Sequence, residues 1–156
     1  MAEHEAWSLA ATEPIIERWA ATPGGLLPML VEVQETFGFI NSEAIPAIAD
    51  ALNLSRAEVV GVINFYHDFK QEPPAQHSLK VCLAEACQAK GGDALVASLK
   101  QTLGVGPGER TSDGSIDFDP IYCLGNCGLS PALMLDGRVY GRVDAARASQ
   151  LLATTL

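Results

Sequence analysis

The sequence predicts an α+β protein, with an N-terminal helical bundle over residues 1–72 and an α/β domain over residues 73–156. Three observations predict it. The first half has helical periodicity with cap residues, and the second half alternates short strands with helices. The net charge also changes at Glu72-Pro73-Pro74, because residues 1–72 hold 11 acidic and three basic side chains, and the rest hold eight and seven. A Pro-Pro pair at such a change is typical of a boundary between domains.

Composition already excludes several classes of function. The chain has 156 residues, 48% of them apolar, and a formal net charge of −9. Nucleic acids and anionic membranes attract basic surfaces, so neither is an expected partner. No apolar run approaches the roughly 20 residues that span a bilayer, and residues 1–5 lack the order of a signal peptide. We therefore expect a cytoplasmic protein with no direct membrane contact.

Four amphipathic helices are expected in the first half, over residues 13–21, 26–37, 41 or 42 to 52, and 56–65. Thr12 is predicted to cap the first helix. In the second, Leu27 and Val31 are assigned to the apolar stripe. Ser55 and Glu58 have capping-box spacing and so predict the start of the fourth helix.

Nothing in this half predicts catalysis. His67 and Asp68 form the one arrangement that resembles an acid–base pair, and we interpret His67 as a solvated residue at a helix end. No catalytic site is expected on this chain alone.

The second half predicts strands over residues 78–82, 116–122, 132–135 and 138–140, and helices over 94–103 and 145–152. Asp93 and Asp144 are the expected helix caps. Asp136-Gly137 is typical of a tight hairpin turn. This β-α-β-β-α order favours a layer of helices packed on a small sheet.

Four cysteines carry the chemistry, in the pattern Cys82-x4-Cys87 and Cys123-x3-Cys127. Each pair follows a predicted strand, so both pairs can lie at one end of the sheet. Reduced thiols are expected in an acidic chain without a signal peptide, which makes disulfides the least favoured interpretation. Soft sulfur ligands select zinc, copper(I) or iron–sulfur. A 2Fe–2S cluster is favoured over zinc, because the x4 and x3 loops can wrap opposite ends of a two-iron cluster.

The surroundings of the cysteines fit such a group. No charged side chain occurs from residue 121 to residue 135. Gly125 and Gly128 let the backbone approach the sulfurs and direct N–H groups at them. Three leucines near the thiols are expected to limit the access of water, which tunes a reduction potential. They are Leu83, Leu124 and Leu129.

This cysteine pattern resembles the thioredoxin-like 2Fe–2S ferredoxin family. That family includes the small iron–sulfur subunit of complex I and the equivalent subunits of NAD-linked hydrogenases and formate dehydrogenases. The resemblance covers residues 26 to 152, and it includes the segments 30–38 and 58–66. It implies a thioredoxin-like second domain and one 2Fe–2S cluster, for which the resemblance makes ligands of Cys82, Cys87, Cys123 and Cys127. It also raises the question of a cis bond between Ser130 and Pro131.

Within the family, the segments 65–69, 84–89 and 123–132 are most similar to the gamma subunit of molybdenum- or tungsten-containing formate dehydrogenase. The resemblance therefore implies an electron-transfer subunit of a cytosolic NAD-dependent formate dehydrogenase, which exchanges single electrons with the flavin of a partner. FMN, NAD and molybdopterin are expected only on partners, namely a flavin/NAD-binding subunit and a large molybdopterin/iron–sulfur subunit. The alternatives are the 2Fe–2S subunit of NADH:quinone oxidoreductase or of an NAD-linked hydrogenase, and a zinc-stabilised interaction module.

Overall fold

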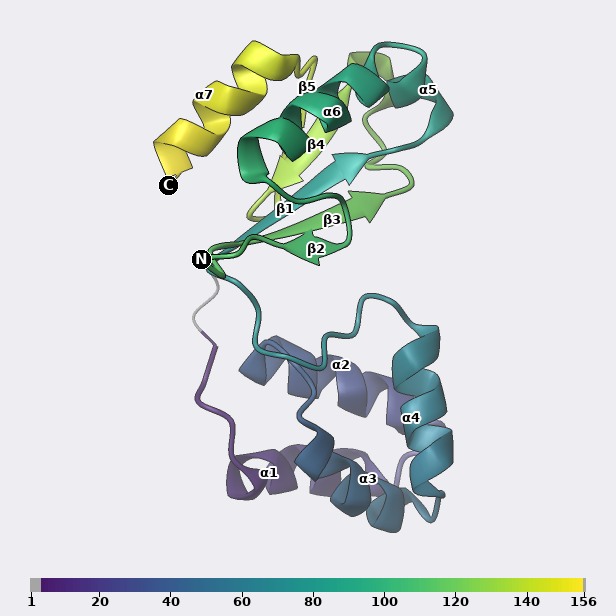
Figure 1. Ribbon diagram of the computed structural model, residues 1–156. Coiled ribbons are helices and arrows are strands. Elements are labelled where there is room, and N and C mark those ends of the chain that lie inside the picture. The colour runs from purple at the N-terminus through teal and green to yellow at the C-terminus, as the bar shows by residue number, and fades with distance from the viewer. Residues whose placement is uncertain (1–3, 156) are drawn as a thin grey trace. The chain divides into compact units, whose positions relative to one another are not determined.

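The chain forms two compact units, one ending at Pro74 and the other beginning at Ala75 (Figure 1). The computed structural model describes residues 4–155, so residues 1–3 of the acidic start and residue 156 lie outside it. No helix within the described range is both long and apolar enough to cross a membrane. The expectation that residues 1–72 and 73–156 are separate domains stays a prediction about folding behaviour.

Over the described residues up to Pro74, the first unit is built of four α-helices and one short 3-10 turn. Its elements are α1 (Leu9–Ala20), α2 (Leu26–Phe37), η1 (Ser42–Ala44), α3 (Ile45–Leu52) and α4 (Arg56–Phe65). All four helices contribute to one apolar core, whose buried members include Ile16, Leu30, Phe37, Ile48 and Ile63. The predicted helical part is therefore confirmed as a small bundle.

The cap of α1 differs from the prediction. Ser8, and not Thr12, is the N-cap, and its side chain accepts a hydrogen bond from the Ala11 N–H at 3.1 Å. Thr12 lies buried inside the helix, where its hydroxyl donates to the Ser8 carbonyl at 2.9 Å. The helix begins one turn earlier because the segment after Ser8 is rich in good helix formers.

The apolar stripe assigned to α2 is wrong at two positions. Leu27 and Val31 are 37% and 41% exposed, whereas Met29, Leu30 and Val33 are fully buried. Leu27 and Val31 are four residues apart, so they share a second stripe that is turned away from the core. The capping box at α4 is confirmed, with Ser55 and Glu58 bonding each other's backbone N–H groups.

The second unit is a five-stranded sheet in the order β2-β3-β1-β4-β5. Its strands are β1 (His77–Cys82), β2 (Glu109–Arg110), β3 (Ile116–Ile121), β4 (Ala132–Leu135) and β5 (Arg138–Gly141). Strands β1 and β3 are parallel, and the other pairs are antiparallel. The hairpin turn between β4 and β5 is confirmed at Asp136 and Gly137, which both have positive φ.

Two helices cover one face of this sheet (Figure 1), namely α6 (Gly92–Leu103) and α7 (Ala145–Thr155). Alternate strand residues point into the layer between sheet and helices, and the buried set includes Leu79, Phe118, Leu133, Leu99 and Leu152. This arrangement confirms the predicted layer of helices packed on a small sheet.

The predicted cap of α6 is wrong, and that of α7 is confirmed. Helix α6 begins at Gly92 after Gly91, which has φ 94°, so Asp93 lies within the first turn. Asp144 accepts the Arg147 N–H at 2.8 Å, as expected of a cap. The sequence analysis did not predict β2 or the four-residue helix α5 (Glu85–Gln88). Both elements are too short to show a recognisable hydrophobic periodicity.

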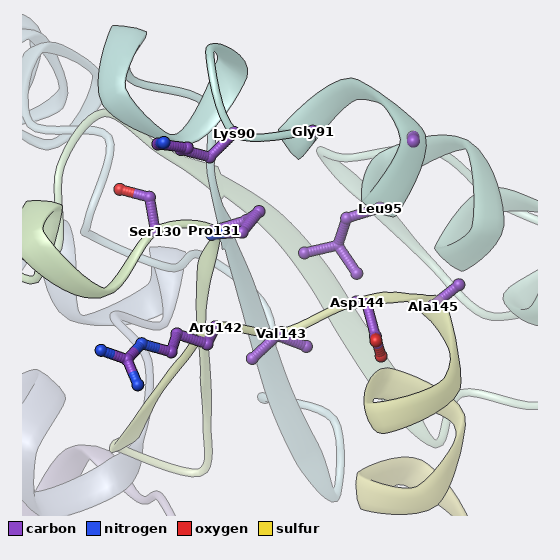
Figure 2. A pocket seen from close by; sticks show the side chains of 10 residues that line it. Lys90, Gly91, Leu95, Ser130, Pro131, Arg142, Val143, Asp144 and Ala145 are labelled. Atoms are coloured by element: carbon purple, nitrogen blue, oxygen red, sulfur yellow. The ribbon is translucent and has the colours of Figure 1, made fainter.

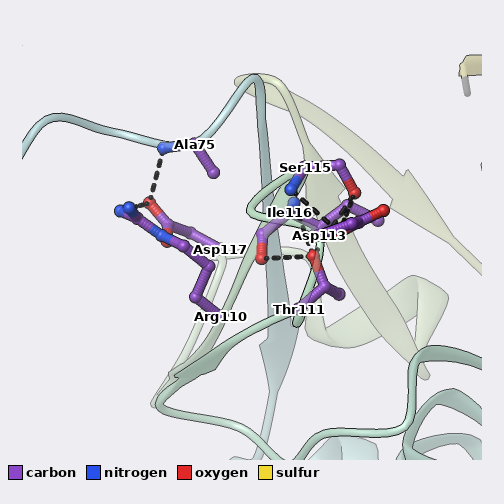
Figure 3. Close-up of polar contacts among 7 residues, drawn as sticks. All are labelled: Ala75, Arg110, Thr111, Asp113, Ser115, Ile116 and Asp117. Atoms are coloured by element: carbon purple, nitrogen blue, oxygen red, sulfur yellow. Dashed lines mark hydrogen bonds and ion pairs between the residues drawn. The ribbon is translucent and has the colours of Figure 1, made fainter.

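Polar contacts fix the start of β3, one of the two strands that lead to cysteines (Figure 3). Arg110 pairs with Asp117 at 2.7 Å across the β2–β3 ladder. The other carboxylate oxygen of Asp117 accepts the Ala75 N–H at 3.1 Å. The carboxylate thus ties the first residue of this unit to its sheet.

The turn before β3 is ordered by a second carboxylate. Asp113 accepts the N–H of Ser115 at 3.0 Å and its hydroxyl at 2.8 Å. Hydrogen bonds from the Thr111 hydroxyl and from Ser115 lower the pKa of Asp113 to about 2, because they favour its charged form.

Candidate functional site

Both cysteine pairs follow the ends of neighbouring parallel strands. Cys82 is the last residue of β1 and is paired in register with Ile121, the last residue of β3. Beyond this point the Leu83 N–H still donates to the Ile121 carbonyl at 2.8 Å. Parallel strands end at the same edge of a sheet, so the loops that carry Cys87, Cys123 and Cys127 leave from one place.

The first pair, Cys82 and Cys87, is buried. These side chains are 3% and 2% exposed, and they cluster with the buried Ala132. Cys87 lies on α5, where its N–H donates to the Ala84 carbonyl at 2.9 Å. Burial, and then the hydrogen bond and charge of Cys82, raise the pKa of the Cys87 thiol.

The second pair, Cys123 and Cys127, is exposed. Their sulfurs lie 3.6 Å apart, and the Gly125 N–H donates to the Cys123 sulfur at 3.3 Å. Cys123 has φ 150°, a conformation that residues other than glycine rarely adopt. The Gly125 N–H, followed by Cys127, lowers the pKa of Cys123, because both hydrogen bonds stabilise a thiolate. The predicted approach of the Gly125 amide to sulfur is confirmed.

The two pairs are neighbours in the fold. The hydrogen bond and charge of Cys123 raise the pKa of Cys127, and the charge of Cys82 in the other pair adds to this effect. Within residues 4–155, no three His, Cys, Asp or Glu side chains converge on one point. The thiols therefore stand as two adjacent pairs.

The thiol pairs fit a metal–sulfur group better than disulfides. All four cysteines are free. A disulfide would hold its sulfurs about 2 Å apart, whereas two sulfurs each about 2.3 Å from a shared tetrahedral metal lie about 3.8 Å apart. The observed separation of 3.6 Å between Cys123 and Cys127 is close to the second value. Four thiol ligands in two neighbouring pairs are the donor set that a 2Fe–2S cluster takes.

The chain after Cys127 supports the exposed loop, and sequence reasoning missed most of this support. Cys127–Leu129 forms a 3-10 turn, η2, and the Ser130 hydroxyl donates to the Cys127 carbonyl. The Ser130-Pro131 bond is cis. Next, the Arg142 N–H donates to the Leu129 carbonyl at 2.6 Å. The hydrogen bond of the Ser130 hydroxyl could have been predicted from the sequence, because Ser and Thr side chains commonly bond nearby backbone groups. The contact with Arg142 could not, because it joins segments that are distant in sequence.

A pocket of about 380 Å³ borders the site (Figure 2). It lies between the start of α6 and the chain around Pro131, and Leu95 and Val143 form apolar parts of its wall. In Figure 2 the side chains of Lys90 and Arg142 point to the same side as the Ser130 hydroxyl. Ser130 belongs both to the pocket and to the cysteine site. Lys90 and Arg142 therefore lie beside the segment 121–135, which has no charged side chain.

The remaining sequence candidates lie elsewhere. His67 is exposed and follows the end of α4 in the first unit. Leu129, expected to shield the sulfurs, is 43% exposed, whereas Leu124 is partly buried and packs against Cys82 and Cys87. The shielding assigned to Leu129 is therefore smaller than expected, because η2 holds this side chain at the surface.

Similar chains occur among known proteins. Residues 12–156 match the model of the thioredoxin-like [2Fe-2S] ferredoxin family. The NADP-reducing hydrogenase subunit HndA of Solidesulfovibrio fructosivorans is 33% identical over 138 residues, which cover 88% of this chain and 81% of that one. A chain of the NADH-quinone oxidoreductase of Pseudomonas aeruginosa is 36% identical over 120 residues, or 77% of this chain and 72% of that one.

A solved structure is also similar. The crystal structure of an NAD+-reducing [NiFe]-hydrogenase in the H2-reduced state superposes with a TM-score of 0.70 at 28% identity. The match covers 83% of this chain but 22% of the hydrogenase chain, so the present chain corresponds to about a fifth of that longer one.

Proposed function

The chain belongs to the thioredoxin-like [2Fe-2S] ferredoxin family, and from that premise we propose that it is an electron-transfer subunit of an NAD-linked oxidoreductase complex. The proposal depends on one observation: the four cysteines form two neighbouring pairs where strands β1 and β3 end. Relatives that align over most of their own length are subunits of NADH-quinone oxidoreductases and of a hydrogenase. The family also makes the predicted zinc-stabilised module the weaker interpretation.

We assign one 2Fe–2S cluster to Cys82, Cys87, Cys123 and Cys127. When bound, such a cluster supplies reversible one-electron chemistry. The chain's own contribution is to position and tune it. Cys82 and Cys87 would hold the cluster from an apolar, buried environment, and the Gly125 amide stabilises negative charge on the Cys123 sulfur.

The exposed pair faces the side from which a partner can approach. Cys123 and Cys127 are exposed, and the segment 121–135 around them has no charged side chain. We therefore expect a flavin/NAD-binding subunit to dock at this end of the sheet. FMN and NAD would reside on that partner. The names of two similar proteins, one NADP-reducing and one NAD+-reducing, support a link to a nicotinamide cofactor.

The class of complex is the finer part of the proposal. The relatives reported above support the alternative prediction, a subunit of an NADH-quinone oxidoreductase or an NAD-linked hydrogenase, better than a formate dehydrogenase. The formate assignment and its large molybdopterin/iron–sulfur partner rest on the segments 65–69, 84–89 and 123–132 alone. They stay a prediction.

The cluster assignment is tested on the full chain purified without oxygen. Iron and acid-labile sulfide are expected at about two each per chain, with visible absorbance that decreases on reduction. Each of the four Cys→Ser variants should lose or alter that spectrum, and Ser115→Ala, in the turn before β3, is the matched control on the same unit. Zinc in place of iron, or an unchanged spectrum in all four variants, would overturn the assignment.

The complex is tested by co-expression with candidate flavin-bearing subunits from the same genome. The purified complex is supplied with NADH, hydrogen or formate in turn, and reduction of the chain's visible chromophore is followed. Reduction by NADH supports the general function. Reduction by formate would favour the formate class, and reduction by hydrogen the hydrogenase class. A chain that copurifies with no flavin subunit would contradict the proposal.

A further inference from the structure

Two glycines lie so close to the cysteine loops that no side chain fits. Gly92 is the first residue of α6, and a Cβ built there would be 2.7 Å from the Cys87 carbonyl oxygen and 2.9 Å from its carbon. Gly141 is the last residue of β5, and its Cβ would be 2.7 Å from the Leu129 Cβ and 2.8 Å from the Leu129 oxygen. Each glycine therefore touches the backbone of one loop, and each loop carries one cysteine pair.

Glycine is required at both positions because another segment lies close to the Cα atom, and not because the backbone has an unusual conformation. Neither Gly92 nor Gly141 has a positive φ, in contrast to Gly91, Gly125 and Gly137. The left-handed backbone that excludes alanine elsewhere is therefore absent at both positions. Cβ atoms do not approach such neighbours closer than 3.0 Å, so the loop would have to move.

Hydrogen bonds hold each loop on its glycine. The Lys90 N–H donates to the Cys87 carbonyl at 3.2 Å, just before Gly92. The Arg142 N–H donates to the Leu129 carbonyl at 2.6 Å, just after Gly141. A side chain on either glycine would displace the carbonyl group that accepts one of these hydrogen bonds. Because that carbonyl belongs to the loop of a cysteine pair, the cysteine of the same loop would move as well.

We propose that Gly92 and Gly141 are positioning residues, Gly92 for the Cys87 sulfur and Gly141 for the Cys127 sulfur. Their effect on a cluster rests on the proposed function, but their effect on the thiols does not. The two glycines belong to different elements, so each is expected to act on one pair alone.

The test compares Gly92→Ala and Gly141→Ala with Gly61→Ala in the full chain. Gly61 lies in α4, outside the cysteine site, has no positive φ, and has open space where a Cβ would stand. It is therefore a matched control for the added methyl group. Folding of every variant is checked by circular dichroism.

The first readout uses metal-free chain. Timed alkylation followed by mass spectrometry gives the labelling rate of each cysteine. Gly92→Ala should raise labelling of Cys87 several-fold and leave Cys127 unchanged. Gly141→Ala should change labelling of Cys127 and leave Cys87 buried, and Gly61→Ala should change neither. This result does not depend on whether the chain binds iron.

The second readout uses iron-loaded chain. Gly92→Ala and Gly141→Ala should shift the electron paramagnetic resonance spectrum and the midpoint potential, whereas Gly61→Ala should match the parent. Folded variants with unchanged labelling, or variants that perturb all four cysteines equally, would overturn the inference. A variant that fails to fold would also count against it, since its glycine would then be a general requirement of the fold. If the parent binds no cluster, the proposed function fails, and labelling alone decides the inference.

Discussion

Truncating one buried leucine in each unit tests whether the two units unfold independently. Leu30 on α2 is fully buried, and Leu133 on β4 is 1% exposed, so they form a matched pair. Leu→Ala removes buried apolar surface and leaves a cavity, at a cost of about 3 kcal/mol. With a urea dependence of about 1.5 kcal/mol per molar, the unfolding midpoint of the affected unit should fall by about 2 M.

The chain offers a separate signal for each unit. Both tryptophans, Trp7 and Trp19, lie in the first unit, so their fluorescence follows that unit alone. Pulse labelling of the buried Cys87 follows the second unit. Leu30→Ala should lower the fluorescence midpoint and leave the labelling midpoint in place, and Leu133→Ala should do the reverse.

One result would refute this reasoning. If either substitution moved both midpoints by the same amount, the chain would unfold as one cooperative body. The boundary near residues 72–75 would then separate two groups of internal contacts, but it would not separate two independently folding domains.

Three further predictions concern local groups. Ser8→Ala should destabilise the first unit by about 1 kcal/mol, read by tryptophan fluorescence, and an unchanged midpoint would reject Ser8 as the cap. Asp113 should titrate by NMR near its pKa of about 2; because this pKa is depressed from 3.8, its stabilising effect is complete above pH 3.8 and disappears as the pH falls through 2. An ordinary midpoint near 4 would contradict the hydrogen bonds at this turn. In metal-free chain, Cys123 should alkylate faster than the buried Cys82 and Cys87, and equal rates would oppose the observed exposure.

Features that depend on neighbouring residues could be predicted from the sequence. Ser55 and Glu58 satisfy each other's backbone within one turn, so their spacing alone locates the start of α4. Asp136 and Gly137 likewise determine their own turn. The site was predictable in outline for a related reason, because each cysteine pair directly follows a strand, and parallel strands β1 and β3 end side by side.

Features that depend on distant contacts could not be predicted. The closeness of Gly92 to Cys87 and of Gly141 to Leu129 arises only when the sheet and helices are packed. The sequence prediction placed the cap at Thr12, whereas the structure places it at Ser8. Both residue types cap helices, and the burial of Thr12 depends on packing. The exposure of Leu27 and Val31 reflects which of two apolar stripes meets the other helices.

The outer strand β2 has a consequence for the subunit before it joins a complex. The open margin of a sheet offers unpaired amides and carbonyls to which a strand of another molecule can add, and this is a common start of aggregation. Here the outermost strand is two residues long, Glu109 and Arg110, and both are charged and exposed. Arg110 also pairs with Asp117 on the neighbouring strand β3. So short and charged a strand disfavours the addition of a strand from a second copy at β2.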